Sequence, residues 1–306
     1  MADEKHIDPA TGTELKGHEW DGIRELDTPL PRWWLWTFYA TILFAIAYTI
    51  AYPAWPMIHS ATQGMLGWSS RGALDKELTT REAQVAPIRK AIAETLIEAL
   101  PGQPQLMQAA VEGGRAAFRV HCVQCHGSGA AGSKGYPNLN DDDWLWGGNL
   151  ATIEKTIFDG VRNPDHAATR MSQMPAFGRD QLLTEPQVDD VVAYVRTISR
   201  QDRPGAAAQR GARLFADNCA VCHGPTGHGS RELGAPNLTD GIWLYGGDPD
   251  TIRETVWNSR QGVMPRWGDK LDSATVRMLA AYVHSLGGGE AAPVVATAEE
   301  VRDGGK

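Results

Sequence analysis

All four cysteines of the chain lie in two short motifs of identical spacing, CVQCH (122–126) and CAVCH (219–223). The pattern C-x-x-C-H is the attachment sequence of c-type haem. Each cysteine sulfur forms a thioether to a former vinyl group of the porphyrin, and the adjacent histidine binds the iron as an axial ligand. The sequence therefore predicts two haem c groups, held by these two sets of residues: Cys122, Cys125 and His126; Cys219, Cys222 and His223.

Closely spaced cysteines also occur in zinc sites and in thioredoxin-like redox sites. A structural zinc site does not require a histidine directly after each cysteine pair. A redox pair of the thioredoxin kind belongs to a parallel-sheet pattern, which this sequence lacks. Haem is therefore the preferred interpretation. Because haem uses all four cysteines, no structural disulfide is expected.

Methionine is the expected second ligand of each iron, since its soft sulfur raises the reduction potential of haem. Met174 and Met264 stand at equivalent places in the pattern M-P-x-[F/W]-G, in which the proline stiffens the loop. A lone methionine more often fills a core. Met171 is the alternative ligand in the first copy, but it has no counterpart in the second copy, so Met174 is preferred.

Two further sets of residues are weaker candidates. Pro137 and Pro236, each in the tripeptide PNL, can place a carbonyl oxygen against the ring nitrogen of the ligand histidine and so orient the ring. A structural turn explains these prolines equally well. Candidates to pair with haem propionates are Arg162, Arg170 and Arg266.

These residues lie inside an internal repeat, whose matched segments follow one order in both copies. The matches include GRAAF and GARLF (114–118, 211–215), WLWGG and WLYGG (144–148, 243–247), and QMPAFG and VMPRWG (173–178, 263–268). Apolar residues three to four positions apart predict helices before each cysteine pair and at the end of each copy. We expect a mostly α fold with tandem class I cytochrome c domains at 108–200 and 209–287, joined by a Pro/Gly/Ala linker at 201–208.

A transmembrane anchor is predicted at 33–58, where no charged residue occurs. About 20 apolar residues span a bilayer as a helix, and tryptophans and tyrosines crowd both ends, as membrane interfaces favour. Pro53 and Pro56 end the helix. The polar, acidic residues 1–32 argue against a cleaved signal peptide. A faint excess of Lys and Arg before the helix favours a cytoplasmic N-terminus.

The rest of the chain carries less chemistry. Residues 59–107 are expected to form a helical connection interrupted near Pro87, and residues 288–306 a disordered tail. The net charge of −8 over 306 residues shows no basic signal for nucleic acid.

The chain resembles the dihaem cytochrome c subunit of cbb-type haem–copper oxidases, the CcoP or FixP family. The resemblance covers about residues 6–287. It rests on both C-x-x-C-H motifs, the WLWGG and WLYGG pair, and three further segments: PLPRWWLWTFYATI (29–42), YPAWP (52–56) and SQMPAFG (172–178). Some members have two membrane helices, and this chain is similar to the single-anchor form.

The resemblance implies a function. The complex reduces oxygen to water at a haem–copper centre in a separate catalytic subunit and pumps protons. The chain would relay electrons from a donor cytochrome c, alongside a monohaem cytochrome c subunit, and would not be an enzyme by itself. The resemblance also implies His126/Met174 and His223/Met264 as axial pairs, with the haem domains in the periplasm and the anchor in the bacterial inner membrane.

Two competing functions remain at this stage. A stand-alone membrane-anchored dihaem carrier shares all the haem chemistry and differs only in its partners. A dihaem peroxidase requires one iron with an open or displaceable ligand. The two methionine loops argue against the peroxidase.

Overall fold

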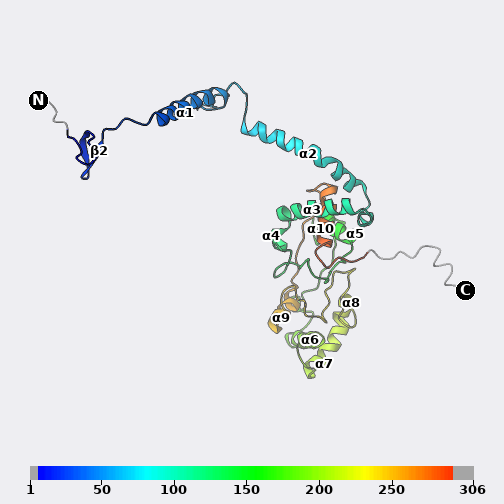
Figure 1. Cartoon of the computed structure of the whole chain (residues 1–306). Coiled ribbons are helices and arrows are strands. Elements are labelled where there is room, and N and C mark those ends of the chain that lie inside the picture. Colours follow the sequence, from blue (N-terminus) through cyan, green and yellow to red (C-terminus); the bar gives the residue numbers. More distant parts are fainter. Residues whose placement is uncertain (1–5, 292–306) are drawn as a thin grey trace. The chain divides into compact units, whose positions relative to one another are not determined.

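The computed structural model describes residues 6–291, which form two units, one ending at Gln84 and the other beginning at Val85. The ends of the chain, including most of the predicted tail, lie outside the described residues. The described fold is mostly helical, as predicted (Figure 1).

A β-hairpin precedes the membrane helix and was not predicted. Its strands β1 (Leu15–Trp20) and β2 (Ile23–Leu26) are antiparallel, with Trp20 opposite Ile23. The turn is Asp21-Gly22, and both residues have positive φ, 49° and 83°. Asp-Gly suits a two-residue hairpin turn because its central positions need positive φ. The Asp-Gly dipeptide is the signal in the sequence that indicates this hairpin. The short strands show no sustained alternation of apolar and polar residues.

Helix α1 (Arg32–Ala51) matches the predicted anchor. It is the one described helix long and apolar enough to cross a membrane, with a mean hydropathy of 1.5. Twenty residues at about 1.5 Å per residue give roughly 30 Å, the thickness of the hydrocarbon core. None of its side chains is buried against the rest of the described chain, so the whole apolar surface is free to face lipid.

Helix α2 (Ser70–Glu94) runs through Pro87, so the predicted interruption there is wrong. Proline removes one helical hydrogen bond. The helix is largely exposed around this position, so water can satisfy the carbonyl group left free. A 3₁₀ helix, η1 (Ile97–Gly102), follows.

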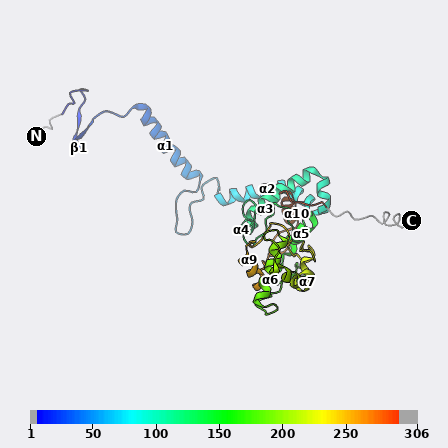
Figure 2. The same ribbon diagram turned by 90° about the horizontal axis from the view of Figure 1, so that it is seen from below.

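The second unit contains two groups of helices, seen in both views (Figures 1 and 2). In the first, α10 packs on α3 and α5; in the second, α6 packs on α7 and α9. The bounds in chain order are α3 (Pro104–His121), α4 (Val123–His126), α5 (Leu150–Asp159), α6 (Glu185–Ile198), α7 (Ala206–Asn218), α8 (Ala220–His223), α9 (Pro249–Asn258) and α10 (Ser273–His284). Each group thus combines the start of one repeat with the end of the other.

The same helix crossing occurs in both groups. Where α3 meets α10, the helices approach so closely that a Cβ on Gly114 would overlap the backbone of Met278, and Phe118 lies 5.3 Å from Tyr282 between ring centroids. In the second group, Gly211 of α7 meets Asp190 of α6 in the same way, and Phe215 lies 5.1 Å from Tyr194.

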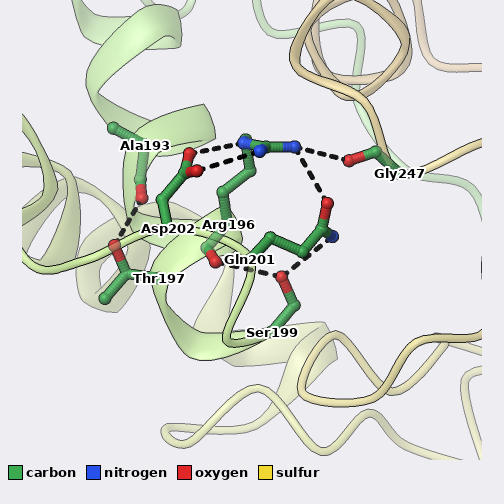
Figure 3. Close-up of polar contacts among 7 residues, drawn as sticks. All are labelled: Ala193, Arg196, Thr197, Ser199, Gln201, Asp202 and Gly247. Carbon is green, nitrogen blue, oxygen red and sulfur yellow. Dashed lines mark hydrogen bonds and ion pairs between the residues drawn. The ribbon is translucent and has the colours of Figure 1, made fainter.

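Hydrogen bonds tie the end of each repeat to the other repeat. Figure 3 shows Arg196, at the end of α6, donating to the Gly247 carbonyl oxygen over 2.8 Å while it also pairs with Asp202. Correspondingly, Trp144 donates its indole N–H to the Gly288 oxygen over 2.6 Å, and Glu290 accepts from the Gly148 amide over 2.7 Å. Residues 288–290 are therefore held in place, which corrects the predicted start of the disordered tail.

Candidate haem-binding sites

The two histidines of the C-x-x-C-H motifs have the same local geometry. His126 Nδ1 lies 3.1 Å from the Pro137 carbonyl oxygen, and His223 Nδ1 lies 3.0 Å from the Pro236 oxygen. The predicted contacts of the two proline carbonyls with the histidine rings are confirmed. A carbonyl at Nδ1 fixes the ring and leaves Nε2 as the iron-binding atom. Burial lowers the pKa of both histidines, partly opposed by the carbonyl contact, which favours the neutral imidazole that a metal needs.

The cysteines are brought together by helical turns. The first cysteine of each motif is the C-cap of a long helix, α3 or α7, and the second lies in the short helix α4 or α8. None of the four forms a disulfide in the described structure. Burial, and then the neighbouring cysteine, raises the pKa of Cys122 and of Cys219 to about 11. A protonated thiol is a poor nucleophile for disulfide exchange. Once a thioether to haem has formed, the sulfur has no proton to lose.

A cavity of about 590 Å³ lies beside His223. Its wall includes Cys219, Cys222 and Met174, together with apolar residues such as Phe215 and Trp243. The volume and mixed lining are those of a cofactor site. The thiols, one imidazole and one thioether sulfur on a common wall are the donor set that haem c requires. The residues present therefore fit the cofactor.

The pairing of histidines with methionines differs from the prediction. Met174 lines the His223 cavity, whereas Met264 and Cys122 both pack against the core cluster of the first helical group, which includes Phe118. The predicted pairs His126/Met174 and His223/Met264 are therefore wrong in this structure, which brings Met264 toward the first motif. Met171, the alternative ligand, is 67% exposed.

The cause of the exchange is a crossing of the two methionine loops. Val161, just after α5, forms an antiparallel bridge with Met264, with both N–O distances 3.0 Å. Beyond it, the Trp267 amide donates to the Ile157 oxygen over 3.2 Å. In the other direction, the Phe177 amide donates to the Val256 oxygen of α9 over 3.1 Å. Chain order alone contains no information about this crossing.

The predicted arginines lie in three different settings. Arg162 lines the His223 cavity, and Arg170 lies over the Trp146 ring, beside α5. Arg266 lies over Phe158 and pairs with Asp269, so it is a poor candidate for a propionate. Arg260, on the His223 cavity wall, was missed. Its position four residues before Met264, matching Arg170 before Met174, was the available signal.

Two carboxylates of the first repeat, Asp141 and Asp143, also line the His223 cavity. Asp143 is half-buried there. Burial raises its pKa to about 6, helped by the nearby Asp240, Asp141 and Asp142 charges and opposed by Arg231. The cavity wall is therefore built by both repeats.

Family comparisons agree with the motifs. Residues 12–59 match the family described as the N-terminal domain of cytochrome oxidase-cbb3, FixP, and residues 109–195 and 206–283 match cytochrome c oxidase, cbb3-type, subunit III. The cbb3-type cytochrome c oxidase subunit CcoP of Cereibacter sphaeroides is 54% identical over 274 residues, covering 90% of this chain and 94% of that protein. The subunit FixP of Rhizobium meliloti is 50% identical over 291 residues, covering 95% and 100%.

Proposed function

The chain belongs to the subunit III family of cbb3-type cytochrome c oxidases, the family of CcoP and FixP, and from this premise we propose that each of its two C-x-x-C-H sites carries one haem c. Its function is that of an electron-transfer subunit of the oxidase. The single observation that carries the proposal of two haems is the repeated histidine–proline contact, made once beside each cysteine pair.

The residues around each site would hold the cofactor without reacting themselves. The cysteines would attach it, the imidazole and a methionine sulfur would ligate its iron, and the carbonyl at Nδ1 would hold the imidazole ring. Bound haem c supplies one-electron transfer. Because a histidine and a methionine would ligate each iron, oxygen or peroxide would not bind there, and the isolated chain would not be an enzyme.

The partners and the location follow from the family and the anchor. The chain would receive electrons from a donor cytochrome c and pass them toward the catalytic haem–copper subunit, next to a monohaem cytochrome c subunit. Helix α1 would hold the chain in the inner membrane, with the hairpin in the cytoplasm and both haem sites in the periplasm.

Purification of the native complex in mild detergent, with haem quantified by type, tests this proposal. The expected result is two haem c groups attached to this chain and oxygen consumption that co-purifies with it. If the chain migrates alone while oxygen consumption stays with other proteins, the stand-alone carrier is the better description.

A further inference from the structure

Two arginines on the wall of the His223 cavity have no carboxylate partner in residues 6–291. Arg162 and Arg260 are both half-buried and both line the cavity. Other arginines of this unit pair with carboxylates, such as Arg253 with Glu185 and Asp189. Burying a cation is costly unless an anion compensates it. The arrangement therefore calls for an anionic group inside the cavity.

Arg162 makes only neutral contacts. Its Nε donates to the Gly262 oxygen over 2.7 Å, and its Nη1 donates to the Ser172 oxygen over 3.3 Å. These carbonyls belong to the two crossing segments that lead to the two methionines. Burial lowers the pKa of Arg162, and the neighbouring charge that opposes this effect comes from Tyr245. For Arg170, by contrast, the opposing charge is the carboxylate of Asp159.

Arg260 is positioned by its own repeat. Its guanidinium lies 4.7 Å from the centre of the Tyr245 ring, its Nε donates to Thr255 Oγ1 over 3.1 Å, and its Nη2 donates to the Thr251 oxygen over 2.6 Å. Arg170 makes the equivalent contacts at the other site, with Trp146, Thr156 and Thr152. One such arginine is therefore a shared property of both sites.

Arg162 has no such counterpart. The stretch from Trp144 to Met174 is nine residues longer than the stretch from Trp243 to Met264. The extra residues begin at the end of α5, where Arg162 lies, and a hydrogen bond of 3.1 Å between His166 Nε2 and Asp159 Oδ1 helps to hold them. The His223 cavity thus has two arginines, one of them contributed by an insertion in the first repeat.

We propose that Arg162 and Arg260 bind the propionate carboxylates of the haem attached to Cys219 and Cys222, and that the insertion bearing Arg162 raises the reduction potential of that haem. The inference rests on the proposed function. A positive charge near the iron disfavours the oxidised form, which carries one more positive charge than the reduced form. Arg162 is therefore a residue of the first repeat that tunes the reduction potential of the haem attached to Cys219 and Cys222.

The test is spectroelectrochemical titration of the detergent-solubilised full chain with both haems attached. Arg162→Gln should shift the oxidised/reduced ratio of one haem about tenfold toward oxidised, which is 59 mV for one electron. Met174→His should lower the reduction potential of the same haem and so identifies it in the titration. Arg162→Lys keeps the charge and should restore most of the potential, whereas a purely structural hydrogen-bonding role would not be rescued by lysine.

Two control variants separate charge in the cavity from charge in general. Arg253→Gln removes the same charge from the surface of the same helical group and should leave both potentials unchanged. Arg170→Gln should move only the other haem. If Arg162→Gln does not fold with two haems, Arg260→Gln alone provides the test.

The outcomes for the two claims are distinct. A chain that never attaches haem at Cys219 and Cys222 overturns the proposed function. A chain with both haems attached, in which neither Arg162→Gln nor Arg260→Gln moves the component identified by Met174→His, overturns this inference alone.

Discussion

The two haem sites are alike in everything that comes from the motif and different in what the other repeat contributes. Each has a histidine held by a proline carbonyl and an arginine held by two threonines of the neighbouring helix. The His223 cavity receives Met174 from the first repeat, as the first site receives Met264 from the second, and it additionally receives Arg162, Asp141 and Asp143. Each repeat therefore forms the local contacts of one site, whereas each packed group of helices is built from both repeats.

The helix crossings show the same contrast. In the second group, Arg210 of α7 pairs with Asp190 of α6 over 2.6 Å. In the first group, an apolar contact occupies the equivalent place, where Gly113 faces the Met278 sulfur. The exchange of ends is consistent along the whole length of each crossing.

Replacing the ligand methionines should have the largest effect and tests the exchange directly. In the full chain, Met174→His should remove the sulfur-to-iron absorption band of one haem and lower its potential by on the order of 0.1–0.3 V, part of the roughly 0.8 V range that axial ligands span. In a chain with Cys219→Ala and Cys222→Ala, only the haem at His126 remains. Its spectrum should then respond to Met264→His and not to Met174→His. The reverse response would restore the pairing predicted from chain order.

A methyl group at either helix crossing should have the next largest effect. Gly114→Ala and Gly211→Ala each force a Cβ against a backbone carbonyl, and overpacking of this kind costs about 1–3 kcal/mol. Hydrogen exchange of the intact chain locates the damage. Gly114→Ala should speed exchange in α10, and Gly211→Ala in α6.

A glycine in open surroundings controls for this substitution. Gly241, in an exposed loop, has nothing near its missing Cβ, so Gly241→Ala should leave exchange unchanged. Faster exchange of α6 in the Gly114→Ala variant would mean that the repeats are not exchanged in solution.

The Asp143 carboxylate should make the His223 side sensitive to pH. Its pKa in the folded chain is about 6, above the ordinary 3.8, so the folded state binds the proton more tightly than the unfolded chain. That contribution to stability is fully present below the unfolded value and is lost as pH rises through 6. Asp143→Asn should therefore stabilise the chain at about pH 8 and not at about pH 3.

The size of this effect is limited by solvent. The full shift corresponds to about 3 kcal/mol, but screening of a half-exposed carboxylate reduces the expected gain to about 1 kcal/mol. Denaturant unfolding at the two pH values measures it. Asp142→Asn, at an exposed neighbour, is the control, and an equal gain in both variants would point to general charge repulsion.

The smallest effect is expected at the ion pair between α6 and α7. Arg210 is largely exposed, so Arg210→Gln should destabilise the chain only slightly, and the loss should shrink in high salt. Met278→Leu, at the equivalent apolar crossing, should show no salt dependence. Salt-dependent unfolding of the two variants compares the crossings, and an identical salt response would remove this difference between them.

The sequence by itself determined the cofactor chemistry, the membrane anchor and the existence of two sites. These follow from local signals: C-x-x-C-H occupies a single turn, a carbonyl from PNL reaches the adjacent histidine, and α1 needs only length and apolarity. The hairpin was equally local, through Asp21-Gly22, and was overlooked.

Only the tertiary structure decided which methionine lies at which haem site. The two repeats carry the same motifs in the same order, and sequence order does not distinguish a closed arrangement from an exchanged one. The choice depends on long-range contacts, such as the bridge between Val161 and Met264 and the bond from Arg196 to Gly247. The same contacts bring Arg162 to a haem site about 60 residues further along the chain.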